Sequence, residues 1–273
     1  MAAPSTVPRP LVIVKLGGSV ITRKREVERL RPKVLARLAR EVVEGSREAR
    51  VVLLHGAGSF GHPGARRFGL ARPPEPGGSA AHRIRGAAIV ATEVRRLHLG
   101  VLQALVRAGG APASVPISTH AHSREGVLAD LESRPFSEAL ERGGLPVSFG
   151  DVVPDAVWGS SILSADTIAR ALVPALRPVR VLFVSDVPGV LEGRPGGART
   201  VVPEVTREVA DALRASPRTP DVTGGIRGKA EAMLAIAAAG TDAALISGLT
   251  DGALARAIRG ESVYGSWAHT GTR

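Results

Sequence analysis

Residues 51–63, with the sequence VVLLHGAGSFGHP, constrain the fold more than any other part of this chain. Their apolar start predicts a buried strand, which is followed by Gly56, Gly58, Gly61 and His62. Open α/β sheets bind ligands at the carboxyl ends of their strands, and backbone N–H groups in a glycine-rich turn can hold a phosphate there. The segment therefore predicts an α/β fold with an anion-binding turn.

Alternating strands and helices are predicted along the rest of the chain. An apolar run at 11–16, a helical pattern at 32–44 and the strand at 51–54 form a βαβ unit, which implies parallel strands. Similar patterns predict strands at 113–117, 145–149, 179–184, 243–247 and 262–267, and helices at 84–108, 136–142, 162–176, 230–239 and 252–258. Because no repeat and no dividing linker is found, residues 11–273 are expected to form one α/β domain with a mostly parallel sheet, after a flexible tail at 1–10.

The segments between these elements are predicted to be irregular. Residues 63–81 are rich in Pro, Gly and Arg and are expected to form a mobile loop. The polar segment 119–126, which carries His120 and His122, is also interpreted as a loop without the carboxylates of a metal site. We expect a hairpin-like turn at 192–199 and a second glycine-rich turn at 221–229.

Composition and charge exclude several classes of protein. The formal net charge is +11, from 36 basic and 25 acidic residues, but the basic residues are scattered and not interleaved with aromatic ones, so we expect no nucleic-acid partner. The absence of cysteine excludes a disulfide framework and thiolate metal sites. The first apolar run is too short for a signal or spanning segment, which predicts a cytoplasmic protein without stable membrane association.

Two common phosphate-binding patterns are matched only in part. HGAGSFGH contains G-x-G-x-x-G, but a dinucleotide site also needs an acidic residue after a second strand, and only Glu75 in the predicted loop lies nearby. TGGIRGKA has Thr223 where a Walker A loop has its first glycine, and Ala230 where that loop has a magnesium-binding hydroxyl. Neither a Rossmann fold nor a P-loop is therefore predicted.

Lysine is rare in this chain, which makes its positions informative. Lys15 lies inside an apolar strand and Lys229 follows a glycine-rich turn. Burying an ammonium group is costly unless it meets an anion, so both are candidate phosphate ligands. Asp151 and Asp186 end strands, where ligand-facing residues collect, and Asp166 begins a helix, where it could simply be a cap.

Six segments in order resemble the amino acid kinase family over nearly the whole chain. They are KLGGSVIT at 15–22, HGAGSFGH at 55–62, GD at 150–151, ILSADTIA at 162–169, SDVPGVL at 185–191 and DVTGGIRGK at 221–229. His62 points to the branch of the family whose acceptor is itself a phosphate. The resemblance implies an open αβα sandwich, usually a homodimer, with an acceptor-binding lobe at about 11–177 and a nucleotide-binding lobe at about 178–273.

The resemblance also implies a role for each matching residue. Lys15 and Lys229 would neutralise the transferring phosphoryl group, and Asp166 would hold both lysines. His62 would bind the acceptor phosphate. The nucleotide side would include Lys15, Gly17, Gly18, Ser19, Ala57, Asp186, Gly189, Gly224, Gly225 and Lys229. The acceptor side would include Gly56, Ala57, Gly61, His62 and Ala165.

The implied activity is transfer of a phosphoryl group from ATP, with Mg²⁺, to isopentenyl phosphate, in isoprenoid biosynthesis through the mevalonate pathway. No direct metal ligand is assigned. Three alternatives stay open: a fosfomycin-type phosphonate kinase, a non-catalytic nucleotide-binding member of the fold, and, on charge alone, a nucleic-acid-binding protein. The chain departs from the family pattern at Ala57, Ala165, Thr167 and Pro188.

Overall fold

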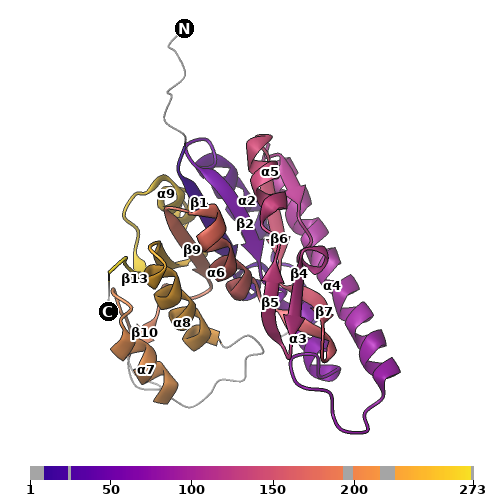
Figure 1. Ribbon diagram of the computed structural model, residues 1–273. Coiled ribbons are helices and arrows are strands. Elements are labelled where there is room, and N and C mark those ends of the chain that lie inside the picture. The colour runs from indigo at the N-terminus through magenta and orange to yellow at the C-terminus, as the bar shows by residue number, and fades with distance from the viewer. Residues whose placement is uncertain (1–8, 24–25, 193–198, 216–224, 272–273) are drawn as a thin grey trace.

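The computed structural model describes residues 9–23, 26–192, 199–215 and 225–271. Within these residues, seven strands form a central sheet in the order β13-β12-β9-β1-β2-β6-β3 (Figure 1). Neighbouring strands are parallel except β12 and β13, which confirms the predicted mostly parallel sheet. The strands are β1 (Leu11–Leu16), β2 (Arg50–His55), β3 (Pro112–Ser114), β6 (Leu145–Phe149), β9 (Arg180–Ser185), β12 (Asp242–Ser247) and β13 (Gly265–Ala268).

Strand β1 shows why helices cover both faces of this sheet. Its side chains alternate, so Leu11 and Ile13 join one hydrophobic core while Val12 and Val14 join another. A strand buried on both faces is a continuous apolar run, which is the pattern that predicted it. The first core is covered by α5 (Arg134–Glu141), α6 (Ala165–Leu176), α7 (Arg207–Ala215) and α8 (Gly225–Ala238), and the second by α2 (Pro32–Gly45), α4 (Ala80–Arg107) and α9 (Ala253–Arg259). The open αβα sandwich is therefore confirmed.

The central sheet is continuous across the expected lobe boundary. Residues 11–177 supply β1, β2, β3 and β6, and residues 178–273 supply β9, β12 and β13. The two groups of strands join where β1 pairs in parallel with β9, with Val12 opposite Arg180. The two expected lobes thus share one sheet.

The predicted loop at 63–81 is wrong in its first part, because the glycine-rich turn continues into helix α3 (Gly58–Arg67), which contains Pro63. Proline has no N–H with which to bond the carbonyl of Ser59 one turn earlier. That carbonyl accepts the N–H of Glu28 instead, at 3.1 Å. A partner from a distant segment makes proline tolerable here, and no local sequence pattern shows that partner.

A second sheet corrects two further predictions. Segment 119–126, predicted to be a loop, contains β4 (Ala121–Arg124), which pairs antiparallel with β5 (Val127–Leu131). The helix predicted from 162 begins later, since 162 and 163 end strand β8 (Gly159–Leu163), which pairs antiparallel with β7 (Asp151–Asp155). The order in this sheet is β5-β4-β7-β8.

One buried carboxylate ties the two hairpins of this second sheet together. Asp155 accepts the backbone N–H groups of Glu125 and Gly126 at the β4–β5 turn, and those of Val157 and Trp158 at the β7–β8 turn. Burial alone would raise the pKa of Asp155, but these N–H groups outweigh it and lower the pKa. The turns are therefore held by a charged acceptor.

The remaining elements are short. They are α1 (Gly18–Ile21), the 3₁₀ turn η1 (Ile117–Thr119), β10 (Leu191–Glu192) and β11 (Thr200–Val201). Strands β10 and β11 pair antiparallel, which confirms a hairpin around 192–199, although residues 193–198 lie outside the described residues. Residues 1–8 and 216–224 also lie outside them, including most of the expected tail and the start of the second glycine-rich turn.

Candidate active site

A cleft of about 590 Å³ lies at the carboxyl ends of the central strands. Helices α1, α3 and α6 begin at this cleft, each just after a strand ends, and α8 begins there with Gly225. Most residues predicted for the site line this one cleft: Lys15, Gly17, Gly18, Ser19, Gly56, Ala57, Gly61, His62, Ala165, Asp166, Asp186, Gly225 and Lys229. The sequence segments that they come from are thus brought together by the fold.

Two predicted nucleotide-binding residues are not placed in the cleft. Gly189 lies against Ser266 and Val201, where an added Cβ would come within 2.6 Å of the Ser266 hydroxyl oxygen. Its observed role is close packing between β13 and the β10–β11 hairpin. Gly224 lies outside the described residues.

Lys15, Asp166 and Lys229 form a buried triad at the floor of the cleft. Lys15 Nζ lies 2.6 Å from Asp166 Oδ1, and Lys229 Nζ lies 3.3 Å from Asp166 Oδ2. Each side chain is between 7% and 12% exposed. One carboxylate thus holds two ammonium groups that come from opposite ends of the chain.

The charges of this triad leave a net positive site. Burial alone would raise the pKa of Asp166, but Lys15 and Lys229 outweigh burial and lower it, so the carboxylate stays ionised. Two cations against one anion give a formal charge of +1 in a desolvated position. A site with this charge favours an anion over a cation.

The glycine-rich turns that follow β1 and β2 are in direct backbone contact. A Cβ on Gly56 would lie 2.9 Å from the nitrogen of Gly18, and Gly18 itself packs against Gly58. Thr22 joins the turns, since its hydroxyl donates to the carbonyl of Gly18 at 2.7 Å and accepts the N–H of Ser59 at 3.0 Å. Sequence reasoning missed Thr22, whose role depends on a segment 37 residues away.

Backbone N–H groups at the starts of α1 and α3 are available to a ligand. Among the described residues, no group accepts a hydrogen bond from the N–H of Gly18, Ser19, Ala57 or Gly58. The first N–H groups of a helix have no partner within the helix, and together with the helix dipole they favour an anion. The cleft therefore combines two lysines with two helix starts.

Two of the four departures from the family pattern, Ala57 and Thr167, fit the local backbone. Ala57 has φ of −72° and ψ of −25°, an ordinary right-handed conformation, whereas Gly58 has φ of +51° and remains glycine. Thr167 belongs to the start of α6, where its N–H donates to Ser164 Oγ at 3.1 Å. The alanine and the threonine therefore preserve the local helix starts.

Part of the cleft lining is apolar. His62 and Arg66 lie one turn apart on α3 and both line it, together with Val90 and Val94 of α4 and Ile162 of β8. Arg66 was missed because its segment was predicted to be a loop. A helical interpretation of 58–67 would have placed it beside His62.

Two further carboxylates line the cleft. Asp151 is buried, and its pKa is raised by burial although Arg95 Nη2 lies 3.0 Å from its Oδ2. Asp186 accepts a hydrogen bond from Ser19 Oγ at 2.7 Å, which links the end of β9 to the start of α1. Both were predicted from their positions at the ends of strands.

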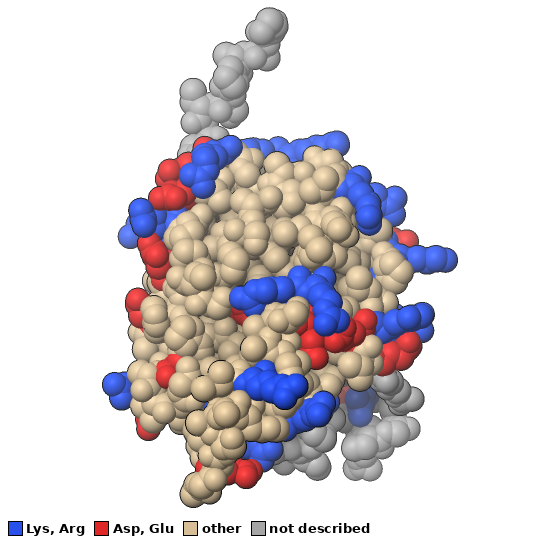
Figure 2. All heavy atoms as spheres, turned by 90° about the vertical axis from the view of Figure 1, so that its right-hand side faces the viewer, with Lys and Arg blue, Asp and Glu red and all other residues tan. Residues whose placement is uncertain are grey.

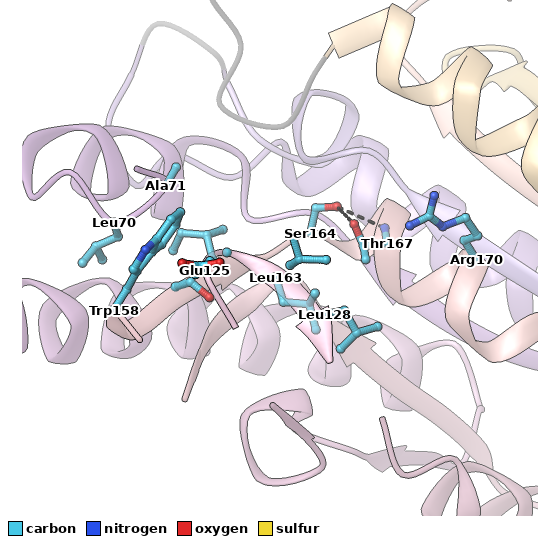
Figure 3. Close-up of a pocket in the computed structure, with 13 residues that line it drawn as sticks. Leu70, Ala71, Glu125, Leu128, Trp158, Leu163, Ser164, Thr167 and Arg170 are labelled. Atoms are coloured by element: carbon cyan, nitrogen blue, oxygen red, sulfur yellow. Dashed lines mark hydrogen bonds between the residues drawn. The ribbon is translucent and has the colours of Figure 1, made fainter. Parts of the chain in front are cut away.

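A second cavity, of about 470 Å³, adjoins the cleft along β8 (Figure 3). The two cavities share Ile162, Leu163 and Ser164. Leu70 and Trp158 lie at one end of the second cavity and Arg170 at the other. The end of strand β8 therefore separates the second cavity from the cleft and lines both.

The chain belongs to the amino acid kinase family, whose sequence pattern matches residues 10–247. This match covers both glycine-rich turns and all three members of the buried triad. It also agrees with the αβα sandwich and with a cleft that is built from helix starts and lysines.

Individual relatives narrow the comparison within that family. The chain is 32% identical to an isopentenyl phosphate kinase of Methanothermobacter thermautotrophicus over 94% of this chain and 98% of the relative. It is 37% identical to an isopentenyl phosphate kinase of Haloferax volcanii over 84% of this chain and 89% of the relative. A solved structure of an isopentenyl phosphate kinase superposes with a TM-score of 0.82 at 29% identity, over 94% of this chain and 99% of that one.

Proposed function

We propose that this chain transfers the γ-phosphoryl group of ATP to isopentenyl phosphate and forms isopentenyl diphosphate. The observation that carries the proposal is the meeting of Lys15 and Lys229 on Asp166, in a cleft that also contains His62 and apolar side chains. The similarity to isopentenyl phosphate kinases over nearly the whole chain supports this choice of acceptor.

The chemistry needs charge neutralisation more than a base. A phosphate monoester has a second pKa of about 6, so the attacking oxygen is already ionised near neutral pH. Two anions must approach in line through a loose transition state. Lys15 and Lys229 are positioned to offset that repulsion, and Asp166 keeps both ammonium groups in place before the substrates arrive.

In this proposal, the turn after β1 binds the phosphates of ATP and the turn after β2 binds the acceptor phosphate. The N–H groups of Gly18 and Ser19 bind the ATP phosphates, with Asp186, Gly225 and the unplaced Gly224 on the same side. Gly56, Ala57, Gly61, Ala165 and His62 surround the acceptor phosphate. His62 orients the oxygens that do not attack, and the prenyl tail lies against Val90 and Val94 of α4.

Magnesium fits the cleft as a partner of ATP. Among the described residues, no three His, Cys, Asp or Glu side chains cluster as a metal site. Mg²⁺ needs no such cluster, because it usually keeps several waters and binds one or two carboxylates together with substrate phosphates. Asp186, beside Ser19 at the nucleotide side, is the carboxylate that we assign to it. The ion would neutralise phosphate charge.

The assembly and the location are further parts of the proposal. We assign residues 11–177 to an acceptor lobe and 178–273 to a nucleotide lobe, in a cytoplasmic homodimer that serves a mevalonate-type route to isoprenoids. None of the described helices is both long enough and apolar enough to cross a bilayer. On the α4 side of the molecule, Lys and Arg side chains stand in separate groups between uncharged surface (Figure 2), which favours no nucleic-acid partner.

An ADP-release assay tests the proposed acceptor. Isopentenyl phosphate, dimethylallyl phosphate, longer prenyl phosphates and fosfomycin are compared at equal concentrations, with ATP and Mg²⁺ in excess. We expect the highest kcat/KM with isopentenyl phosphate. Preference for fosfomycin would favour a phosphonate kinase, and ATP binding without turnover of any acceptor would favour a non-catalytic nucleotide-binding protein.

A further inference from the structure

A chain of hydrogen-bonded polar side chains lies behind the turn at residues 56–58, here called the acceptor turn, and takes no part in the proposed reaction. Two of its members, His55 and His98, are buried, and Ser114 is exposed. His55 ends β2 and His98 is on α4, and His55 Nε2 lies 3.1 Å from His98 Nδ1. Beyond them, His55 Nδ1 lies 3.2 Å from the carbonyl oxygen of Gly56, and His98 Nε2 lies 2.8 Å from Ser114 Oγ. The chain therefore runs from Ser114, at the end of β3, to Gly56.

The chemistry of the hydrogen-bonding groups allows only one direction of donation along this chain of hydrogen bonds. A carbonyl oxygen only accepts, so the proton of His55 is on Nδ1 and its Nε2 must accept. His98 then carries its proton on Nδ1, and its Nε2 accepts from the hydroxyl of Ser114. The order of donation is Ser114 to His98, His98 to His55, and His55 to Gly56.

Both imidazoles are neutral at physiological pH. Burial, followed by the neighbouring His98, lowers the pKa of His55 to about 3, and burial, followed by Arg95, lowers that of His98 to about 4. Both rings pack against Phe149: His55 is stacked on it at a centroid separation of 5.4 Å, and His98 is tilted against it at 4.3 Å. The neutral rings are therefore held in place on both their faces and their edges.

This chain of hydrogen bonds fixes the orientation of one peptide group, the one that joins Gly56 to Ala57. In a trans peptide the C=O and the following N–H point in opposite directions. Because His55 holds the carbonyl of Gly56, the N–H of Ala57 points away from the imidazole. Ala57 lines the cleft, and among the described residues nothing accepts a hydrogen bond from its N–H.

We propose that His55 and His98, oriented by Ser114, are positioning residues that aim the Ala57 N–H at the phosphate bound by the acceptor turn. That this phosphate belongs to the acceptor rests on the proposed function. The orientation of the Ala57 N–H toward the cleft does not depend on it. Packing alone does not explain these two histidines. Apolar rings of similar shape would fill the same space without the cost of burying polar ring nitrogens.

The tautomers test the proposal without any assay of activity. Long-range ¹H–¹⁵N spectra at pH 7, assigned with His55→Asn and His98→Gln variants, should show the proton on Nδ1 of both His55 and His98. The Ala57 amide resonance should shift on titration with inorganic phosphate. A proton on Nε2 of His55, or an Ala57 amide that does not respond to phosphate, would overturn the proposal.

Ser114→Ala tests the far end of the chain at an exposed position that does not line the cleft. Without the hydroxyl, His98 is free to move its proton to Nε2, and His55 then loses its donor. We expect the KM for isopentenyl phosphate and the apparent Kd for inorganic phosphate to rise about two- to tenfold, as for one lost neutral hydrogen bond, with kcat nearly unchanged. The exposed Ser262→Ala variant is the matched control and should change neither.

Two variants at His55 separate orientation from packing. His55→Leu removes the donor, and His55→Asn keeps an N–H close to the position of Nδ1. Asparagine should recover phosphate affinity relative to leucine if the N–H matters, and equal losses at equal folding stability would contradict the proposal. If the wild type turns over no prenyl phosphate, the proposed function fails, while the tautomers and the phosphate titration still decide this inference.

Discussion

The backbone of Gly18 lies against the backbone of Gly58, and a Cβ on Gly18 would come within 2.5 Å of the Gly58 Cα. These residues belong to the turns after β1 and β2, which pair in register from Leu11 opposite Arg50 to Leu16 opposite His55. The two turns thus form one rigid backbone unit. In the proposed reaction, that unit sets the separation between the donor and acceptor phosphates.

Replacing Gly18 by alanine tests this contact. The added methyl group would meet backbone atoms of Gly58, which cannot rotate away as a side chain can. We expect a loss of about 1–3 kcal/mol in unfolding free energy from overpacking. We also expect kcat/KM to fall about 100-fold, as is typical when reacting groups are displaced by about 1 Å. Urea unfolding and steady-state kinetics measure the two effects.

Gly100→Ala is the control for that substitution. Its Cβ would meet only the end of the Leu30 side chain, at 3.3 Å, and the position is inside helix α4. Its activity should match the wild type. Equal activity of the Gly18 and Gly100 variants would show that the two turns are not held at a fixed separation.

Lys15→Ala removes one of the two cations proposed to neutralise the transferring phosphoryl group. Loss of one preorganised electrostatic contact typically costs about 10²–10³ in kcat, and we expect a loss of at least that size. Circular dichroism should remain native, because Lys229 still pairs with Asp166. Lys33→Ala, at an exposed position on α2, should retain full activity. An active Lys15 variant would exclude the proposed mechanism.

His62→Ala tests the acceptor side. A hydrogen bond to a charged group contributes about 1.5–3 kcal/mol, so kcat/KM for isopentenyl phosphate should fall roughly ten- to a hundredfold. The KM for ATP should change little, because we place His62 on the acceptor side. Initial rates over a grid of both substrates separate the two constants. His122→Ala, at an exposed position on β4, is the matched control, and a rise confined to the KM for ATP would reverse our assignment of the two sides.

The buried histidines predict how stability depends on pH. The pKa of His55 is lowered to about 3 and that of His98 to about 4, from an ordinary value of 6.5. As pH falls below 6.5, the unfolded chain binds protons at these residues that the folded chain does not, so stability falls. Each imidazole contributes a slope of up to about 1.4 kcal/mol per pH unit, until the pH approaches its folded pKa.

Urea unfolding at pH 7, 6 and 5 measures this slope. A His98→Gln variant should show a slope shallower by up to about 1.4 kcal/mol per pH unit, even if it is less stable at every pH. His82→Gln, which removes an exposed histidine outside this pair, is the matched control. A wild-type stability that stays constant from pH 7 to 5 would mean that the two histidines are not buried as neutral groups.

The sequence was sufficient to predict the central strands because burial on both faces leaves a continuous apolar run. Strand β1 was predicted with its observed bounds, and the helix predicted at 84–108 corresponds to α4, which spans Ala80–Arg107. The position of the cleft was predictable for a related reason. The segments that contain the glycines and lysines stand at the ends of β1 and β2 or at the start of α8. The roles of the individual residues remain predictions.

The errors occur where contacts between distant segments decide the local structure. Helix α3 contains Pro63 because Glu28 satisfies the carbonyl that proline leaves open. Strand β4 has only one apolar residue, the buried Ala121, and is held in part through Asp155, which binds the turn that follows it. His55 and His98 are 43 residues apart, so no spacing rule connects them. Each case depends on a partner that a local pattern cannot contain.

Strand β1 pairs with β2 on one side and with β9 on the other, and it carries Lys15 between Leu54 and Phe183. A hinge between the two proposed lobes would have to break the backbone ladder at the middle of the sheet. We therefore expect Lys15 to keep its position relative to both neighbouring strands whether or not substrates are bound. Differences in acceptor among related chains would then arise in the segments that line the cleft rather than in β1.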